Sequence, residues 1–309
     1  MATRRPSGPA DPGLPRMNVN AAPERRPYDP ANSPNRPGGP SIRPQSLLLA
    51  FFGNHVLDEG PLYVYSGSII DILARTGVGE QAVRSTLSRM VNRVLLTRRK
   101  NGRRMYFGLT PLATEILCDG RRRIWETSAV NEDWDGTWTL LGFSLPDSWH
   151  SRRHDLRSRL SWLGFGPLYN GLWIAPGHVE LTAVIDELNL SAHVKIFHAR
   201  ADDATDIRLM VSDTWDLDSL AARYTSFAQH WSTVEWSASD AIAVRLCLVS
   251  EWLGIIRSDP RLPGPCLPAE WPARRAEEIF HHVASGTEGP ARELASTVLD
   301  TLPGNASPV

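Results

Sequence analysis

Apolar residues recur at intervals of three and four positions between residues 80 and 94, a spacing that predicts an amphipathic helix. Val83, Leu87, Met90, Val91 and Val94 fall on one stripe, which we expect to face a core. The opposite stripe is polar, and its guanidinium, amide and hydroxyl groups are suited to base edges and phosphates in a major groove. The residues on or beside this polar stripe are Gln81, Arg84, Ser85, Ser88, Arg89, Asn92 and Arg93.

Two strand-like runs, LLTRR and RRMYFGL, follow this helix and are separated by Asn101 and Gly102. Asn-Gly between such runs favours a β-hairpin with a type I′ turn, in which both turn residues have positive φ. The predicted hairpin is strongly basic, with the cations Arg98, Arg99, Lys100, Arg103 and Arg104 on its arms.

The helix and the hairpin belong to a longer pattern. The apolar spacing predicts a helix that begins near Pro44 and a shorter helix over 66–77 that Gly77 closes, and Thr110-Pro111 predicts the start of a helix over 111–126. A short helix, a tight turn, a second helix with a polar face and a basic hairpin are the parts of a winged helix-turn-helix. We therefore predict a DNA-binding domain of this kind over residues 44–127.

The pattern changes after residue 134. Strands are predicted over 136–145, 171–176 and 193–200, with amphipathic helices between them. Alternating strands and helices of this length predict a ferredoxin-like α+β domain over 134–205.

From residue 214 to residue 290 the periodicity is helical, and residues 239–258 are apolar on all sides, as in a buried helix. We expect a helical C-terminal domain here, which makes the whole chain an α+β protein. Residues 1–43 hold ten of the 24 prolines and almost no aliphatic residues, so we expect a disordered tail. A second disordered tail is predicted over 291–309.

Charge is distributed unevenly along the 309 residues. Residues 78–109 contain eight Lys and Arg against the single acid Glu80, a balance of +7, although the whole chain sums to −1. Residues 128–309 contain 14 basic and 24 acidic residues, a balance of −10. A protein that places one face on phosphates and keeps the rest away from them needs such an uneven distribution of charge.

Three cysteines without CxxC spacing argue against a disulfide framework or a zinc site and favour a reducing cytosol. No run approaches 18 apolar residues and the first residues lack an apolar stretch, so we expect no membrane span, no secretion and a cytoplasmic location. No phosphate-binding glycine loop or hydrolase motif occurs, and we predict neither a cofactor nor a metal.

Three motifs, taken together, resemble the PaaX family of bacterial transcriptional repressors, from about Arg43 to about Val283. The first motif is AVRSTLSRM with RRMYFGLTPLA, the second is WTLLGFSLP with RLSWLGFGPLYNGLWIAPG, and the third is DPRLP followed by LPAEWP. The resemblance implies a homodimeric regulator of a catabolic operon, such as one for phenylacetate or another aromatic acid. It also implies a Cas2-like middle domain, a duplex DNA operator as partner, no enzymatic activity and a small-molecule effector of the acyl-coenzyme A type.

The resemblance transfers DNA contacts to Arg84, Ser85, Arg89 and the basic residues of the hairpin. The effector pocket is unknown at this stage. Two departures from the family pattern are Gly79, where serine is common as a helix cap, and Ala273, where glycine is expected.

Two other classes of function compete with this one. A Cas2-like fold suggests a metal-dependent nuclease, but the first strand of the middle domain ends in Phe143-Ser144-Leu145 without an acid, and Asp147 is interpreted as a helix cap. A protein-interaction scaffold has no need of five cations in its hairpin. The cluster at residues 121–123, three arginines, is equally compatible with contact to the DNA backbone and with pairing to acids.

Overall fold

The computed structural model describes residues 42–236 and 240–304. Residues 1–41, 237–239 and 305–309 lie outside the described part, and so do most of the predicted N-terminal tail and the last five residues of the predicted C-terminal tail. The N-terminal elements are α1 (Pro44–His55), β1 (Leu62–Tyr65), α2 (Ser66–Ala74), α3 (Glu80–Asn92), β2 (Leu96–Asn101), β3 (Arg104–Leu109) and α4 (Pro111–Trp125).

The predicted order of helices and hairpin is present, with the additional strand β1 between α1 and α2. The ends of the helices follow from single residues. Pro44 begins α1, Gly77 has φ 83° after α2, and the Thr110 side chain accepts a hydrogen bond of 3.1 Å from the Ala113 amide at the start of α4.

Two details of the predicted helix and hairpin are wrong. Val94 does not face the core: it is 62% exposed and has φ 57°, because α3 ends at Asn92 and the chain must reverse into β2. In the hairpin Asn101 still pairs with Arg104, and positive φ occurs at Gly102 but not at Asn101. The turn therefore has Gly102 at its first central position, as in type II′ turns.

The middle region is a four-stranded antiparallel sheet in the order β5-β6-β4-β7, with two helices on one face. This is the β-α-β-β-α-β arrangement predicted as ferredoxin-like, with β5 as the strand that the sequence pattern missed. The elements are β4 (Thr137–Phe143), α5 (His150–Trp162), β5 (Gly166–Tyr169), β6 (Leu172–Pro176), α6 (Thr182–Glu187), the 3₁₀ turn η2 (Ser191–His193) and β7 (Val194–Arg200).

Leu141 and Trp173 on the sheet pack against Leu156 and Leu160 of α5, and these side chains form a separate small core. Asp147 does not cap α5, since Trp149 occupies the N-cap position and makes no side-chain capping bond.

After β7 the described residues form the α-helices α7 (Ile207–Thr214), α8 (Leu217–Thr233), α9 (Ala241–Ile256) and α10 (Ala273–Val298), with the 3₁₀ turn η4 (Gly264–Cys266) before α10. The helix α9 is buried almost throughout, as its apolar composition predicts. Asp216 and Asp240 cap α8 and α9, respectively, by accepting backbone hydrogen bonds.

The expectation of a disordered tail from residue 291 is wrong for residues 291–304. The helix α10 continues past Pro290 to Val298, and Ala291 and Ala295 are buried on its inner side. The strand β8 (Thr301–Pro303) then pairs with β1 and completes a four-stranded sheet in the order β2-β3-β1-β8. These residues are ordered because the N-terminal sheet offers β8 a partner edge, which no local sequence pattern announces.

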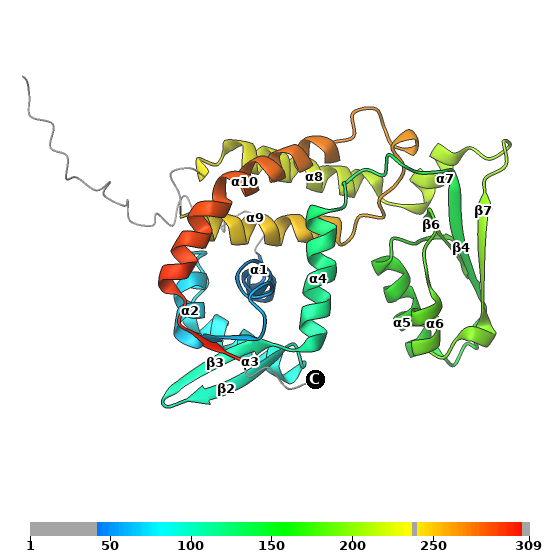
Figure 1. The fold of residues 1–309 in the computed structure, drawn as a ribbon. Helices are drawn as coiled ribbons and strands as arrows, with labels where there is room; N and C mark the ends of the chain where they lie inside the picture. The colour runs from blue at the N-terminus through cyan, green and yellow to red at the C-terminus, as the bar shows by residue number, and fades with distance from the viewer. Residues whose placement is uncertain (1–41, 237–239, 305–309) are drawn as a thin grey trace, which may run out of the picture.

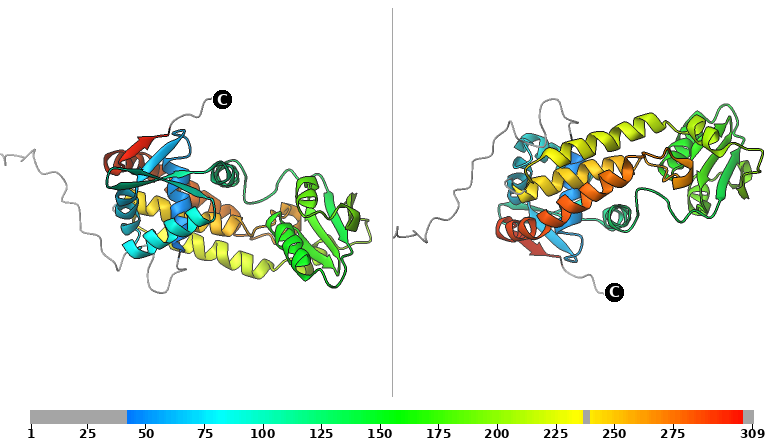
Figure 2. Two further views of the ribbon diagram at one scale, coloured as in Figure 1. Left: turned by 90° about the horizontal axis from the view of Figure 1, so that it is seen from below. Right: turned by 90° about the horizontal axis from the view of Figure 1, so that it is seen from above.

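One large core joins the two ends of the chain. It includes Leu47 and Phe51 of α1, Leu87 of α3, Trp252 of α9 and Phe280 of α10. Figure 1 shows α8, α9 and α10 lying over the N-terminal helices, with the middle region at the opposite end of the molecule. The two views of Figure 2 show the same arrangement, so the C-terminal helices form one body with the N-terminal elements.

Candidate nucleic-acid interface

The helix α3 presents its polar stripe to solvent because its apolar stripe is anchored. Val83, Leu87 and Met90 are buried, and α3 contacts α1, α2 and β2. All seven polar residues predicted for this face are exposed: Gln81, Arg84, Ser85, Ser88, Arg89, Asn92 and Arg93. Gly79 occupies the N-cap position without a side-chain bond, and α3 still begins at Glu80.

The arginines of α3 are held by short-range polar contacts. Arg84 Nε lies 2.7 Å from Glu80 Oε1, and Arg89 Nη2 donates to Thr86 Oγ1 over 2.8 Å. Arg93 Nη1 donates to Gln45 Oε1 of α1 over 3.3 Å. Exposed contacts of this kind contribute about 0–1 kcal/mol each, so a phosphate or a base edge can replace them.

Four of the five cations of the β2–β3 hairpin divide between its two faces, and the fifth lies in the turn. Side chains directly opposite each other in a ladder share a face. Arg98 lies opposite Phe107 and Lys100 opposite Met105, on the face that packs toward the helical core. Arg99 lies opposite Tyr106 and Arg104 opposite Asn101, on the other face. Arg103 lies in the turn.

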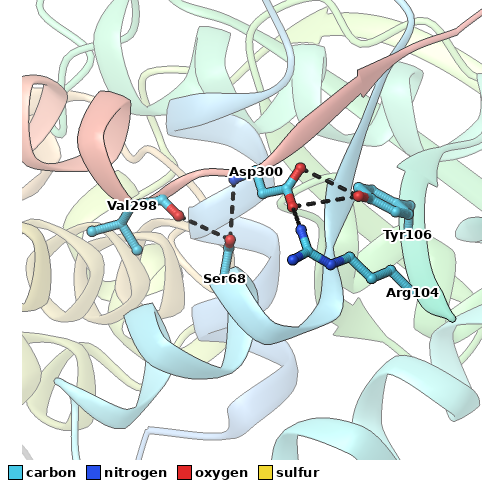
Figure 3. A network of polar contacts seen from close by, with 5 residues as sticks. All are labelled: Ser68, Arg104, Tyr106, Val298 and Asp300. Atoms are coloured by element: carbon cyan, nitrogen blue, oxygen red, sulfur yellow. Dashed lines mark hydrogen bonds and ion pairs between the residues drawn. The ribbon is translucent and has the colours of Figure 1, made fainter. Parts of the chain in front are cut away.

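The outer face of the hairpin is occupied by the C-terminal segment. Asp300, between α10 and β8, forms an ion pair with Arg104 and accepts a hydrogen bond of 3.3 Å from the Tyr106 hydroxyl (Figure 3). Arg99 Nη1 donates to the Pro303 carbonyl over 3.3 Å. Arg104 also lies over the Tyr65 ring, 5.1 Å from its centroid.

Ser68 of α2 fixes this segment from the other side. Its hydroxyl donates to the Val298 carbonyl over 2.9 Å and accepts from the Asp300 amide over 3.1 Å (Figure 3). Sequence reasoning missed both Ser68 and Asp300, because their partners are more than 190 residues away in the chain.

The hairpin cations are therefore not equivalent. Within the described residues Arg98, Lys100 and Arg103 form no hydrogen bond or ion pair, while Arg99 and Arg104 are bound to the C-terminal segment. The three unbound cations are the ones positioned to meet an external anion.

The arginine cluster that follows, at residues 121–123, mostly pairs with acids. Arg121 forms an ion pair with Asp58 after α1, and Arg123 Nε lies 2.9 Å from Asp119 Oδ2. Arg122 is exposed on α4.

In the middle region the strand β4 ends at Phe143, and Asp147 Oδ1 lies 3.5 Å from Arg153 Nη2. Over residues 42–236 and 240–304 no group of three or more His, Cys, Asp and Glu side chains is arranged to hold a metal ion. None of the helices in that part of the chain combines the length and the apolarity needed to cross a bilayer.

These observations define an α+β protein of three parts: a helical N-terminal part with a basic hairpin, a ferredoxin-like middle domain and a helical C-terminal part. Family models match all three. Residues 43–112 match the PaaX-like protein model, residues 131–211 the PaaX protein central Cas2-like domain, and residues 215–297 the PaaX-like protein C-terminal domain. The chain belongs to the PaaX family.

Known proteins similar to this chain include a curated repressor and a solved structure. The transcriptional repressor PaaX of Escherichia coli K12 is 26% identical over 280 residues, which cover 85% of this chain and 87% of that protein. The uncharacterized protein Rv0674 from Mycobacterium tuberculosis has a similar structure, with a TM-score of 0.58 and 21% identity over 83% of this chain and 100% of that one. The second similarity concerns the fold alone.

Proposed function

We propose that this protein is a transcriptional repressor that binds an operator in duplex DNA through α3 and the β2–β3 hairpin. The observation that carries the proposal is the exposed polar stripe of α3 beside three hairpin cations that have no hydrogen-bond or ion-pair partner among the described residues. Family membership supports it, because the similar protein of Escherichia coli is a transcriptional repressor.

In this proposal α3 enters the major groove. Gln81, Ser85, Ser88, Arg89 and Asn92 face the base edges, and Arg84 and Arg93 flank them. The hairpin lies along the neighbouring backbone, where Arg98, Lys100 and Arg103 contact phosphates. Arg99 and Arg104 bind the C-terminal segment, and these contacts position the hairpin.

We further propose that the repressor acts in the cytoplasm as a homodimer on two half-sites, separated by about 34 Å or a multiple of it. The operon it controls serves the catabolism of an aromatic acid, and a metabolite of the acyl-coenzyme A type releases the DNA. Release requires that the metabolite favour a state with lower DNA affinity, by a coupling of roughly 1–3 kcal/mol.

Replacement of Arg89 by alanine tests the placement of α3. We expect weaker binding to DNA from upstream of the gene and a relaxed preference at one base position, by roughly 1–3 kcal/mol. Fluorescence anisotropy against a set of single-base variants of the site measures both effects.

Arg157→Ala is the matched control, because Arg157 is also an exposed helical arginine but belongs to α5 of the middle region. It should leave the affinity unchanged. If Arg89→Ala bound every duplex as the parent does, the placement of α3 in the groove would be wrong.

A further inference from the structure

A cleft of about 210 Å³ lies where α1, α4, α9 and α10 meet. Its walls combine elements from both ends of the chain. Arg121 and Trp125 come from α4, Arg245 from α9, and Arg292 from α10. His55 and Asp58 at the end of α1 and Glu288 of α10 also line it.

Arg245 is the unusual residue of this cleft. It lies in the second turn of the apolar helix α9 and is only 8% exposed. Its Nη1 donates to the Ala284 carbonyl over 2.8 Å, and its guanidinium lies 5.5 Å from the centroid of the Trp125 ring. No carboxylate of the described residues forms an ion pair with it, although a buried charge without a counter-ion is costly.

The carboxylates that line the cleft each form an ion pair with another arginine, although Glu288 also attracts Arg245 electrostatically. Arg121 pairs with Asp58, and Arg292 Nη2 lies 2.8 Å from Glu288 Oε1. Three arginines therefore face two carboxylates, and the remaining positive charge belongs to Arg245.

The pKa of His55 reflects both its burial and the positive charge of the nearby arginines. Its Nε2 is buried and has no hydrogen-bond partner among the described residues. Burial, and then the charges of Arg245 and Arg292, lower the pKa of His55 to about 4. At neutral pH the ring is uncharged, and a ring N–H remains available to donate to an acceptor in the cleft.

We propose that this cleft binds a small oxyanion, a carboxylate or a phosphate group on a small molecule, with Arg245 as its principal counter-charge. Arg292 and Arg121 at the rim and the ring of His55 supply further donors, and charge-assisted hydrogen bonds to arginine suit both kinds of oxyanion. The cleft is smaller than the roughly 300–1,000 Å³ of common ligand pockets, so it accepts the anionic group with a short organic part.

One of the helices that line the site, α10, leads directly into the segment that binds the hairpin. Beyond Arg292 the helix α10 continues to Val298, and Asp300, two residues further on, binds Arg104 and Tyr106. An anion that draws Arg292 toward Arg245 therefore acts on the segment that holds the hairpin. This coupling rests on the proposed function, whereas the binding of an anion does not.

Isothermal titration calorimetry of the full chain without DNA tests the site. The titrants are sodium phosphate and, in a second series, sodium benzoate, in a chloride buffer free of other oxyanions. We expect saturable binding of one equivalent in at least one series, with millimolar or tighter affinity for such small probes. Binding of phosphate alone identifies a phosphate ligand, and binding of benzoate alone identifies a carboxylate.

Arg245→Met should weaken this binding at least tenfold, and Arg292→Ala three- to tenfold. A buried charge replaced by an apolar residue of similar size is usually tolerated, and the exposed Arg292 provides a second variant if Arg245→Met does not fold. Arg275→Ala is the control: it removes an exposed arginine from the first turn of the same helix, and the affinity should not change.

The inference is overturned if neither probe binds saturably, or if Arg245→Met and Arg292→Ala both bind as the parent does. If a probe does bind, adding the tighter one to a DNA-binding assay tests separately whether anion binding in the cleft changes the affinity for DNA. A protein that binds the probe but no duplex would contradict the proposed function and leave the anion site intact.

Discussion

Val94 is a residue in a conformation that its side chain disfavours. Its φ of 57° allows the chain to reverse between α3 and β2, and the Leu95 amide bonds back to the Met90 carbonyl over 2.9 Å. A β-branched residue in this left-handed region is strained, while glycine adopts it freely.

Val94→Gly should therefore raise the free energy of unfolding by about 1 kcal/mol, which chemical denaturation measures. Little packing is lost because Val94 is mostly exposed. Gly77→Ala is the opposite control, since Gly77 has φ 83° and alanine there should destabilise the protein. A less stable Val94→Gly variant would show that the Val94 side chain has a role its exposure does not reveal.

His55 makes stability depend on pH. Its folded pKa of about 4 lies below the ordinary value of 6.5, so the unfolded state takes up the proton more readily between these two values. The contribution of the neutral ring is complete above pH 6.5 and is lost as the pH falls toward 4. A separation of this size corresponds to roughly 3 kcal/mol.

The difference in unfolding free energy between the parent and His55→Phe should change by roughly that amount between pH 7 and pH 4. Equilibrium denaturation across this range measures the difference. His150→Phe, which removes an exposed histidine of α5, is the matched control for the loss of a histidine. A curve for His55→Phe that runs parallel to that of the parent would contradict the lowered pKa of His55.

At the scale of elements, the hairpin supplies two strands of the four-stranded sheet β2-β3-β1-β8. Its inner face packs on the helical core, and on its outer face Arg104 binds Asp300 and Arg99 binds the Pro303 carbonyl of β8. This arrangement predicts that adjacent arginines behave differently toward DNA.

Arg103→Ala should lower the slope of log affinity against log salt concentration by about one, because one phosphate contact is lost. Arg104→Ala should leave the slope almost unchanged, since Arg104 is paired with Asp300. Titrations of one duplex at several salt concentrations measure both slopes. An unchanged slope for Arg103→Ala, or an equal loss for the two variants, would contradict the distinction between the unbound and the bound cations of the hairpin.

The elements that the sequence could predict are those with a local signature. The periodicity of residues 80–93, the cap Thr110 and the glycine Gly77 marked the N-terminal helices, and the strands with alternating apolar residues marked the middle sheet. The short strand β5 carries Gly166 and Pro167 and shows no alternation, so it was missed.

The remaining features depend on contacts between distant residues. The strand β8 is stable only as a partner of β1, and the role of Asp300 exists only beside Arg104. The cleft around Arg245 forms only where four helices from both ends of the chain, α1, α4, α9 and α10, pack together. In the candidate site, the spacing of apolar residues predicted the exposed face of α3. It did not predict which of the five hairpin cations bind the C-terminal segment and which are unbound.

At the scale of the whole molecule, the ends of the chain form one body and the middle region stands at its far side (Figures 1 and 2). The C-terminal helices thus contact the proposed DNA-binding elements directly. In this account a ligand between α4, α9 and α10 reaches the hairpin through α10, without passing through the middle sheet.

The most direct test of the central proposal is the binding of the purified full chain to duplex DNA from upstream of its own gene, measured over a series of salt concentrations. We predict retention at low salt, an affinity that falls linearly with the logarithm of salt concentration, and a preference over unrelated duplexes. If no such duplex is retained even at low salt, α3 and the hairpin do not form a DNA-binding surface.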